Sequence, residues 1–172
     1  MTLEQFLAWD DRQELRFEFD GFEAVAMTGG TAAHAGTKSN LIHALVGRQA
    51  NSPCRAFGSE LKVQVAGRIR YPKAFVVCTP VPPGSTVVRD PVVIFQVVSE
   101  GSGATDFVVK NAEYRATPSV QCYVVLQQTK AAAPVLARCM RCWWRLGRAY
   151  RRARGTSLGV CGVSQRVIRM GT

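Results

Sequence analysis

The sequence predicts an α/β fold, in which helices flank a mixed β-sheet and a helix with a β-hairpin precedes that core. Two observations indicate this fold class. Helix signals appear in three segments, and the segments between them carry the alternation or the continuous apolar runs of strands. The chain has 172 residues, of which 47% are hydrophobic, so a single domain with a sizeable core is expected.

The first predicted elements are a short helix and a β-hairpin. Thr2 and Gln5 have the spacing of a capping box, which predicts a helix at the N-terminal end. Residues 15–19 then alternate apolar and polar side chains, as a strand with one buried face does. Asp20-Gly21 predicts a two-residue turn into a second strand over 22–27, because both residue types tolerate the positive φ angles of a type I′ turn.

The later elements alternate between helix and strand. A long helix is predicted from the N-cap Thr31 to about Gln49, and another over 104–116, ending before Pro118. The strand predicted over 92–98 is almost wholly apolar, as expected of a strand covered on both faces. The remaining strands are predicted over residues 54–57, 61–65, 69–78 with an interruption at Pro72, and 120–126.

Charge is distributed unevenly along the chain. Residues 1–113 contain 11 Lys and Arg against 12 Asp and Glu, whereas residues 114–172 contain 11 Lys and Arg and no acid. This asymmetry predicts a domain over 1–137 followed by a basic tail over 138–172. Two interpretations of the tail stay open. It is an arm that binds nucleic acid through arginines and aromatic rings, or it is disordered or translated from a shifted reading frame.

Other sequence features indicate the cellular compartment of the protein. No apolar run approaches the roughly 18 residues of a membrane span, and no signal peptide is visible, so a cytoplasmic protein without a membrane partner is expected. In the cytoplasm the six cysteines are expected to be mostly reduced thiols, with Cys78 and Cys122 as small buried apolar residues. His34 and His43 are predicted to point to opposite sides of one helix, which favours structural or solvated roles for both.

Five short motifs occur in an order and spacing that resemble a known family. They are Leu15 to Gly21, His34 to Leu45, Ile69 to Pro72, Phe95 to Ser99, and Asp106 to Tyr123. Residues 1 to about 130 are similar to the Uma-two family of restriction endonucleases, within the PD-(D/E)XK nuclease superfamily. The resemblance implies a restriction-endonuclease-like core and a phosphodiesterase that acts on DNA with Mg²⁺ as cofactor.

The resemblance also implies four site residues. The family pattern has a glutamate in the hairpin, an aspartate after Tyr-Pro, a glutamate in the apolar strand and a lysine on the following helix. The corresponding positions here are Glu18, Lys73, Gln96 and Lys110. Glu18 and Lys110 match the pattern, whereas Lys73 replaces the aspartate and Gln96 replaces the second glutamate. Gln96 offers a metal only a neutral carbonyl oxygen.

These two replacements argue against ordinary Mg²⁺-dependent cleavage. Placing an ammonium about 4 Å from a divalent cation costs on the order of 8 kcal/mol at an effective dielectric near 20. The sequence therefore predicts a DNA endonuclease scaffold that is impaired or inactive. Two alternatives stay open: a pseudo-nuclease that binds nucleic acid through Lys73, Lys110 and the tail arginines without cutting it, and a decayed product with no selected role. DNA is the expected partner, and a homodimer is left open.

Without the resemblance, the four residues have plainer interpretations. Glu18 is then a solvated strand residue and Gln96 a hydrogen-bonded core glutamine. Lys73 extends its ammonium out to water, or it occupies the vacated metal position and binds a phosphate directly. Lys110 is then a surface lysine of a helix.

Overall fold

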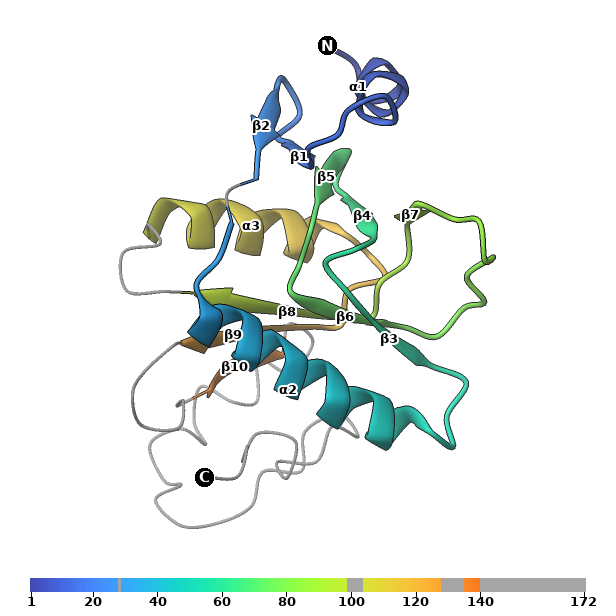
Figure 1. Ribbon diagram of the computed structural model, residues 1–172, viewed down its shortest axis with the longest axis vertical. Helices are drawn as coiled ribbons and strands as arrows, with labels where there is room; N and C mark the ends of the chain where they lie inside the picture. Colours follow the sequence, from blue (N-terminus) through green and yellow to red (C-terminus); the bar gives the residue numbers. More distant parts are fainter. Residues whose placement is uncertain (28, 99–103, 128–134, 140–172) are drawn as a thin grey trace.

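The computed structural model describes residues 1–27, 29–98, 104–127 and 135–139 and has an α/β architecture (Figure 1). Within these residues lie three helices, α1 (Leu3–Asp10), α2 (Ala32–Gln49) and α3 (Ala104–Ala116), and two five-stranded sheets. The α/β class is confirmed. The predicted helix caps are present as well, since Thr2 and Gln5 form a capping box and the Thr31 side chain accepts a hydrogen bond from the His34 backbone N–H.

The first sheet has the strand order β2-β1-β5-β4-β7. Its strands are β1 (Phe17–Phe19), β2 (Ala24–Ala26), β4 (Lys62–Val65), β5 (Arg68–Arg70) and β7 (Val87–Val88). Neighbouring strands are antiparallel except β4 and β7, which are parallel. Helix α1 packs on this sheet, where the buried rings of Phe6 and Phe19 stack with centroids 5.0 Å apart.

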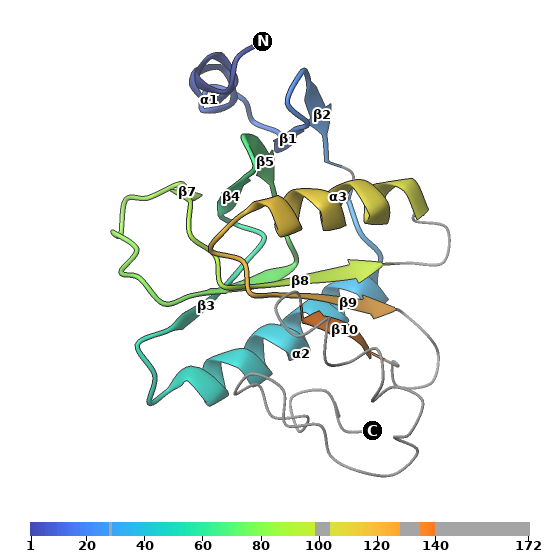
Figure 2. The same cartoon turned by 180° about the vertical axis from the view of Figure 1, so that it is seen from behind.

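The second sheet has the strand order β10-β9-β8-β6-β3 and forms the middle of the molecule. Its strands are β3 (Arg55–Gly58), β6 (Ala74–Val77), β8 (Val93–Val98), β9 (Cys122–Gln127) and β10 (Val135–Cys139). It is mixed, because β8 and β9 are parallel while the other neighbours are antiparallel. Figures 1 and 2 show α2 on one face of this sheet and α3 on the other.

Two apolar clusters hold the helices against the second sheet. Leu41 and Leu45 of α2 pack with Val76 and Phe95 on one face. Tyr114 of α3 packs in a cluster with Phe75, Ile94 and Tyr123 on the other face. Strand β8 is therefore covered on both faces, as its apolar sequence predicts.

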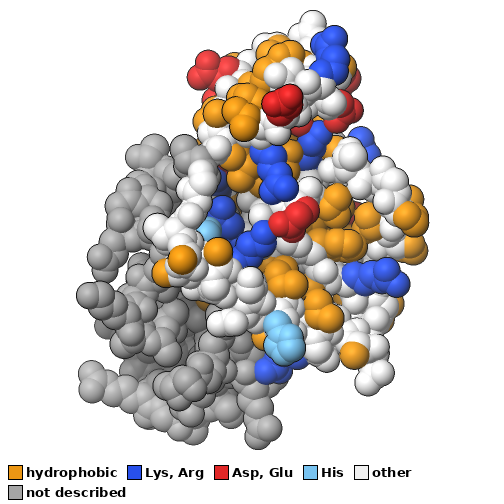
Figure 3. Space-filling view, viewed as in Figure 1, with side chains coloured by type: hydrophobic (Ala, Val, Ile, Leu, Met, Phe, Trp, Pro, Cys, Tyr) orange, Lys and Arg blue, Asp and Glu red, His pale blue; other side chains and the backbone are white. Residues whose placement is uncertain are grey.

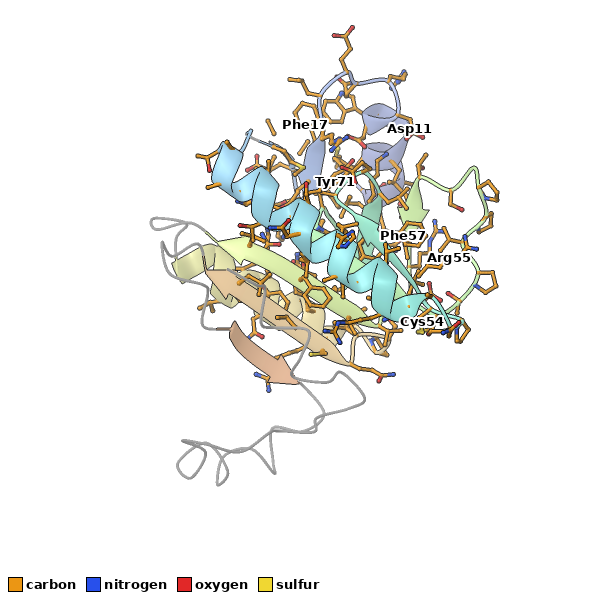
Figure 4. The ribbon with its side chains drawn as sticks, turned by 60° about the horizontal axis from the view of Figure 1, so that its bottom comes forward. Asp11, Phe17, Cys54, Arg55, Phe57 and Tyr71 are labelled. Carbon is orange, nitrogen blue, oxygen red and sulfur yellow. A yellow bond between two sulfur atoms is a disulfide. The ribbon has the colours of Figure 1, made fainter. Side chains whose placement is uncertain are left out.

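The strand predicted over 69–78 is in fact two strands that belong to different sheets. β5 ends at Arg70 in the first sheet, and β6 begins at Ala74 in the second. Pro72 lies between them and has no backbone N–H for a sheet ladder, so the chain leaves one sheet there and enters the other. Tyr71, labelled in Figure 4, lies in this middle region, and its buried side chain packs with Phe6, Phe19 and Ile69.

The hairpin turn also differs from its prediction. The Asp20 N–H donates to the Glu23 carbonyl at 3.3 Å, so Gly21 and Phe22 are the central residues of the turn, instead of Asp20 and Gly21. The Asp20 carboxylate accepts hydrogen bonds from the backbone N–H groups of Phe22 and Glu23, at 2.8 and 2.9 Å. This side-chain turn places the one positive φ angle at Gly21, at 103°.

One pair departs from the expectation that the cysteines are mostly reduced thiols. Cys54 and Cys78 form a disulfide. They flank β3 and β6, whose antiparallel register pairs Arg55 with Val77 and thereby brings the two thiols together. Cys122 is partly buried.

The predicted boundary between residues 137 and 138 falls inside β10, which pairs with β9. Residues 140–172, which contain most of the predicted basic tail, lie outside the described residues, so that boundary and the nature of the tail stay predictions. Within the described ranges, no helix is both long and apolar enough to cross a membrane.

Candidate functional site between the two sheets

The junction of the two sheets positions Lys73 opposite Gln96. The Lys73 N–H donates to the Phe95 carbonyl at 3.0 Å, and Ala74 pairs with Phe95 in the antiparallel ladder of β6 and β8. One step further along the ladder, Lys73 faces Gln96, and both side chains are on the face that carries Phe75 and Ile94. That face is covered by α3, the helix that carries Lys110.

Strand pairing in the first sheet positions Glu18. Phe19 pairs with Ile69, so Glu18 lies next to Arg70 on the neighbouring strand. The Tyr71 N–H donates to Glu18 Oε1 at 3.1 Å, and Arg70 Nη1 donates to Oε2 at 3.2 Å. Lys110 Nζ lies 3.1 Å from Oε2. Glu18 thus joins β1, β5 and α3 in one cluster of charged groups.

All four predicted site residues line one hollow, which we name the central hollow. It has a volume of about 180 Å³, and its lining includes Glu18, Tyr71, Lys73, Gln96, Lys110 and Met27. The structure therefore brings together side chains that are up to 92 residues apart in the sequence. In Figure 3, Lys and Arg side chains gather where the small upper part of the molecule meets the larger body.

A buried ion pair behind the central hollow was missed from the sequence. Arg70 Nε and Nη2 donate to the two carboxylate oxygens of Glu113 at 2.7 and 2.6 Å, and both side chains are buried. Burial opposes the charged form of Arg70, but the bonds to Glu113 outweigh it and raise the arginine pKa. Arg70 directly precedes the Tyr-Pro motif and faces Glu18 across the ladder. Its place beside the Tyr-Pro motif was the one sequence feature that could have marked Arg70 as part of the site. No sequence feature indicated that Glu113 on α3 would be its partner.

The surroundings of the Lys73 side chain disfavour its charged form. Burial lowers the pKa of Lys73, and the nearby Lys110 lowers it further, while Glu18 raises it. Within the described residues, Lys73 Nζ has no hydrogen-bond or ion-pair partner. The Gln96 amide, 9% exposed, also has no hydrogen bond there, so its interpretation as a hydrogen-bonded core glutamine is not supported.

The residues present do not fit a Mg²⁺ ion. Mg²⁺ prefers near-octahedral oxygen ligands, usually including one or two carboxylates. Among the described residues that line the central hollow, Glu18 is the only carboxylate, and it already accepts from Arg70, Lys110 and the Tyr71 N–H. In the same part of the chain, no three His, Cys, Asp or Glu side chains come together where they could hold a metal.

A mixed sheet between two helices, with a polar hollow at its junction with a second sheet, places this chain among the restriction-endonuclease-like α/β proteins. Residues 3–139 match the Uma2 family, described as "Putative restriction endonuclease", and the chain belongs to this family. The function implied by the family is that of a nuclease, which would act on DNA.

Two similar proteins add to this picture. A crystal structure from Anabaena variabilis, described as "a putative nuclease belonging to DUF820", superposes with a TM-score of 0.61. The alignment covers 80% of this chain and 85% of that chain at 15% identity, so it is a likeness of fold. The uncharacterized protein slr1290 of Synechocystis sp. is 27% identical over 132 residues, which span 75% of this chain and 70% of that protein.

Proposed function

We propose that this chain has the scaffold of a DNA endonuclease but does not catalyse efficient Mg²⁺-dependent cleavage. Family membership and fold support the scaffold. The observation that carries the loss of activity is that Lys73 and Gln96 line the central hollow at the two positions where the family pattern has carboxylates. Losing only about 4 kcal/mol of transition-state stabilisation slows a reaction roughly a thousandfold.

Plasmid cleavage in Mg²⁺ or Mn²⁺ tests this proposal. The unaltered protein is compared with a Lys73→Asp, Gln96→Glu double variant, which restores both carboxylates. A matched control is Arg12→Asp, Gln121→Glu, because it makes the same change of charge at two exposed positions outside the central hollow. We expect cleavage by the first variant alone.

Two results would overturn the proposal. If neither the unaltered protein nor the carboxylate variant cuts, the assignment of the site or of the substrate class is wrong. If the unaltered protein cuts as fast as the variant in a metal-dependent way, Lys73 and Gln96 do not decide activity.

A second candidate function is a pseudo-nuclease that binds nucleic acid without cutting it. The observation that favours it is the Lys73 ammonium, which lines the central hollow and has no partner among the described residues. A phosphate oxygen is a suitable partner for such a group. This function predicts affinity for DNA that persists in EDTA and falls steeply with salt, because bound phosphates release counterions. Fluorescence anisotropy in EDTA, at low and at high salt, measures the persistence of binding and its salt dependence.

A further inference from the structure

A second hollow adjoins the central one. It has a volume of about 330 Å³ and shares Lys73 and Met27 with the central hollow. Its size is at the lower end of the roughly 300–1,000 Å³ typical of ligand sites. Because Lys73 lines both hollows, a ligand that extends from one into the other passes this ammonium.

The second hollow is lined by cationic side chains. Arg16, Lys38 and Lys73 all line it, and among the described lining residues there is no Asp or Glu. Arg16 directly precedes β1, Lys38 is on α2 and Lys73 is at the junction of the sheets. Their convergence from separate parts of the chain is a property of the fold, unlike a run of surface charges in the sequence.

Ser59 fixes two of these cations. Arg16 Nη1 donates to the Ser59 carbonyl at 3.0 Å, and Lys38 Nζ donates to the Ser59 hydroxyl at 3.0 Å. Ser59 is itself buried, so it is a firm anchor. Fixing a long cationic side chain in advance lowers the entropy that it loses when a ligand binds.

Glu60 competes for one of the cations. Its Oε1 lies 2.6 Å from Lys38 Nζ, and its side chain is 61% exposed. An ion pair this exposed contributes little to stability, so a ligand phosphate can replace the carboxylate at low cost. Three cations against one exposed carboxylate leave the hollow with a net positive charge.

His34 supplies a polar group of a different kind. Burial lowers the pKa of His34, as do Lys73 and Lys38, which favours the neutral ring near pH 7. A neutral imidazole still donates one N–H. A Cβ at Gly30 would lie 3.2 Å from His34 Cδ2, so glycine at this position leaves room for the ring against the hollow.

We propose that the second hollow binds one phosphate of a nucleic-acid strand whose neighbouring phosphate occupies the central hollow, with Lys73 between the two. This rests on the proposed nucleic-acid function and adds the path of the strand. The strand runs from Lys110 and Gln96, past Lys73, to Lys38, His34 and Arg16.

The test is fluorescence anisotropy of the full chain with a labelled ten-residue oligothymidylate in EDTA, as a function of salt. We expect Lys38→Met to weaken binding several-fold and to reduce the salt slope by about 0.7, the contribution of one phosphate contact on a single strand. We expect Glu60→Gln to strengthen binding, because it releases Lys38. Arg48→Met is the matched control, since Arg48 is an exposed cation on α2 outside both hollows.

The opposite effects of Lys38→Met and Glu60→Gln separate binding from folding, because a merely destabilised variant does not gain affinity. If Lys73→Met weakens binding while Lys38→Met and Glu60→Gln behave like Arg48→Met, the second hollow is not on the strand's path, although the binding function stands. If the unaltered protein binds no oligonucleotide, the inference and the binding function fall together. The plasmid experiment still decides the nuclease scaffold independently.

Discussion

Lys110 Nζ lies 3.1 Å from Oε2 of Glu18, so the carboxylate of the central hollow is paired with a lysine of the same hollow. Arg70 Nη1 lies 3.2 Å from the same oxygen. Two cationic side chains therefore already pair with the Glu18 carboxylate and would compete with a metal ion for it. The hollow presents Lys73 instead, and this reverses the electrostatics that a metal-dependent nuclease needs.

Lys73→Met should stabilise the protein. Burial and Lys110 lower the lysine pKa, so the folded state disfavours the charged form. At pH 7 the substitution should raise the free energy of unfolding by about 1 kcal/mol, or about 2–4 °C in melting temperature. The gain should shrink as the pH rises through the lowered pKa towards 10.5, where the unfolded lysine also loses its proton. Urea unfolding across this range measures it.

Lys62→Met is the contrasting control. Lys62 Nζ lies 2.7 Å from Asp10, whose side chain is buried, so this substitution leaves a carboxylate without its partner and should destabilise the protein. If both lysine variants lose stability alike, the account of Lys73 as an unsatisfied charge is wrong.

Glu113→Gln should destabilise the protein by about 3–5 kcal/mol, because it leaves the buried Arg70 without its bidentate partner. Glu23→Gln, at an exposed position of the hairpin turn, serves as the control. The free energy of unfolding in urea is the measurement. A loss below about 1 kcal/mol, the scale of an exposed ion pair, would contradict the role given to this pair.

The Tyr71 phenol should lose its proton only at a pH above the ordinary range for tyrosine. Burial and the nearby Asp10 raise its pKa to about 12, from the ordinary value of 10.0. Because the folded state holds this proton more tightly than the unfolded state, the contribution of Tyr71 to stability is complete below pH 10 and is lost as the pH rises towards 12. Tyr71→Phe should make the decline of stability over this range shallower. An unchanged decline would argue that the Tyr71 phenol is not shielded.

The disulfide between Cys54 and Cys78 closes a loop with a sequence separation of 24. Loss of a cross-link of this size should cost about 2–4 kcal/mol. We expect dithiothreitol to lower the stability of the unaltered protein by this amount and to leave a Cys54→Ser, Cys78→Ser double variant unaffected. Equal numbers of reactive thiols in the unaltered protein and the double variant would support the disulfide. Two additional reactive thiols in the unaltered protein would count against it.

Local signals in the sequence predicted the helices well. The caps at Thr2 and Thr31 act within one helical turn, so a short stretch of sequence contains both the capping side chain and the group that it caps. The turn at Asp20 was placed one residue too early, because the Asp20 side chain builds a turn that the Asp-Gly pair alone does not specify. The division of the predicted strand at Pro72 depends on how the two sheets meet, and no local sequence pattern indicates this.

The candidate site was accessible from the sequence through motifs, whereas its electrostatic setting was not. Glu18, Lys73, Gln96 and Lys110 were assigned one by one from the family pattern, and strand pairing together with the packing of α3 brings them to one hollow. The ion pair of Arg70 with Glu113 spans 43 residues, and its formation depends on how α3 packs against β5. Long-range packing of this kind leaves no spacing in the sequence that could reveal it.

The most direct test of the central claim is a Mn²⁺ titration followed by electron paramagnetic resonance, with Mn²⁺ in place of Mg²⁺. The unaltered protein is compared with the Lys73→Asp, Gln96→Glu variant. The account predicts that one Mn²⁺ binds the variant at concentrations where the unaltered protein binds none. Binding of one Mn²⁺ by the unaltered protein, abolished by Glu18→Gln, would contradict it, because the central hollow would then hold a divalent cation despite its two lysines.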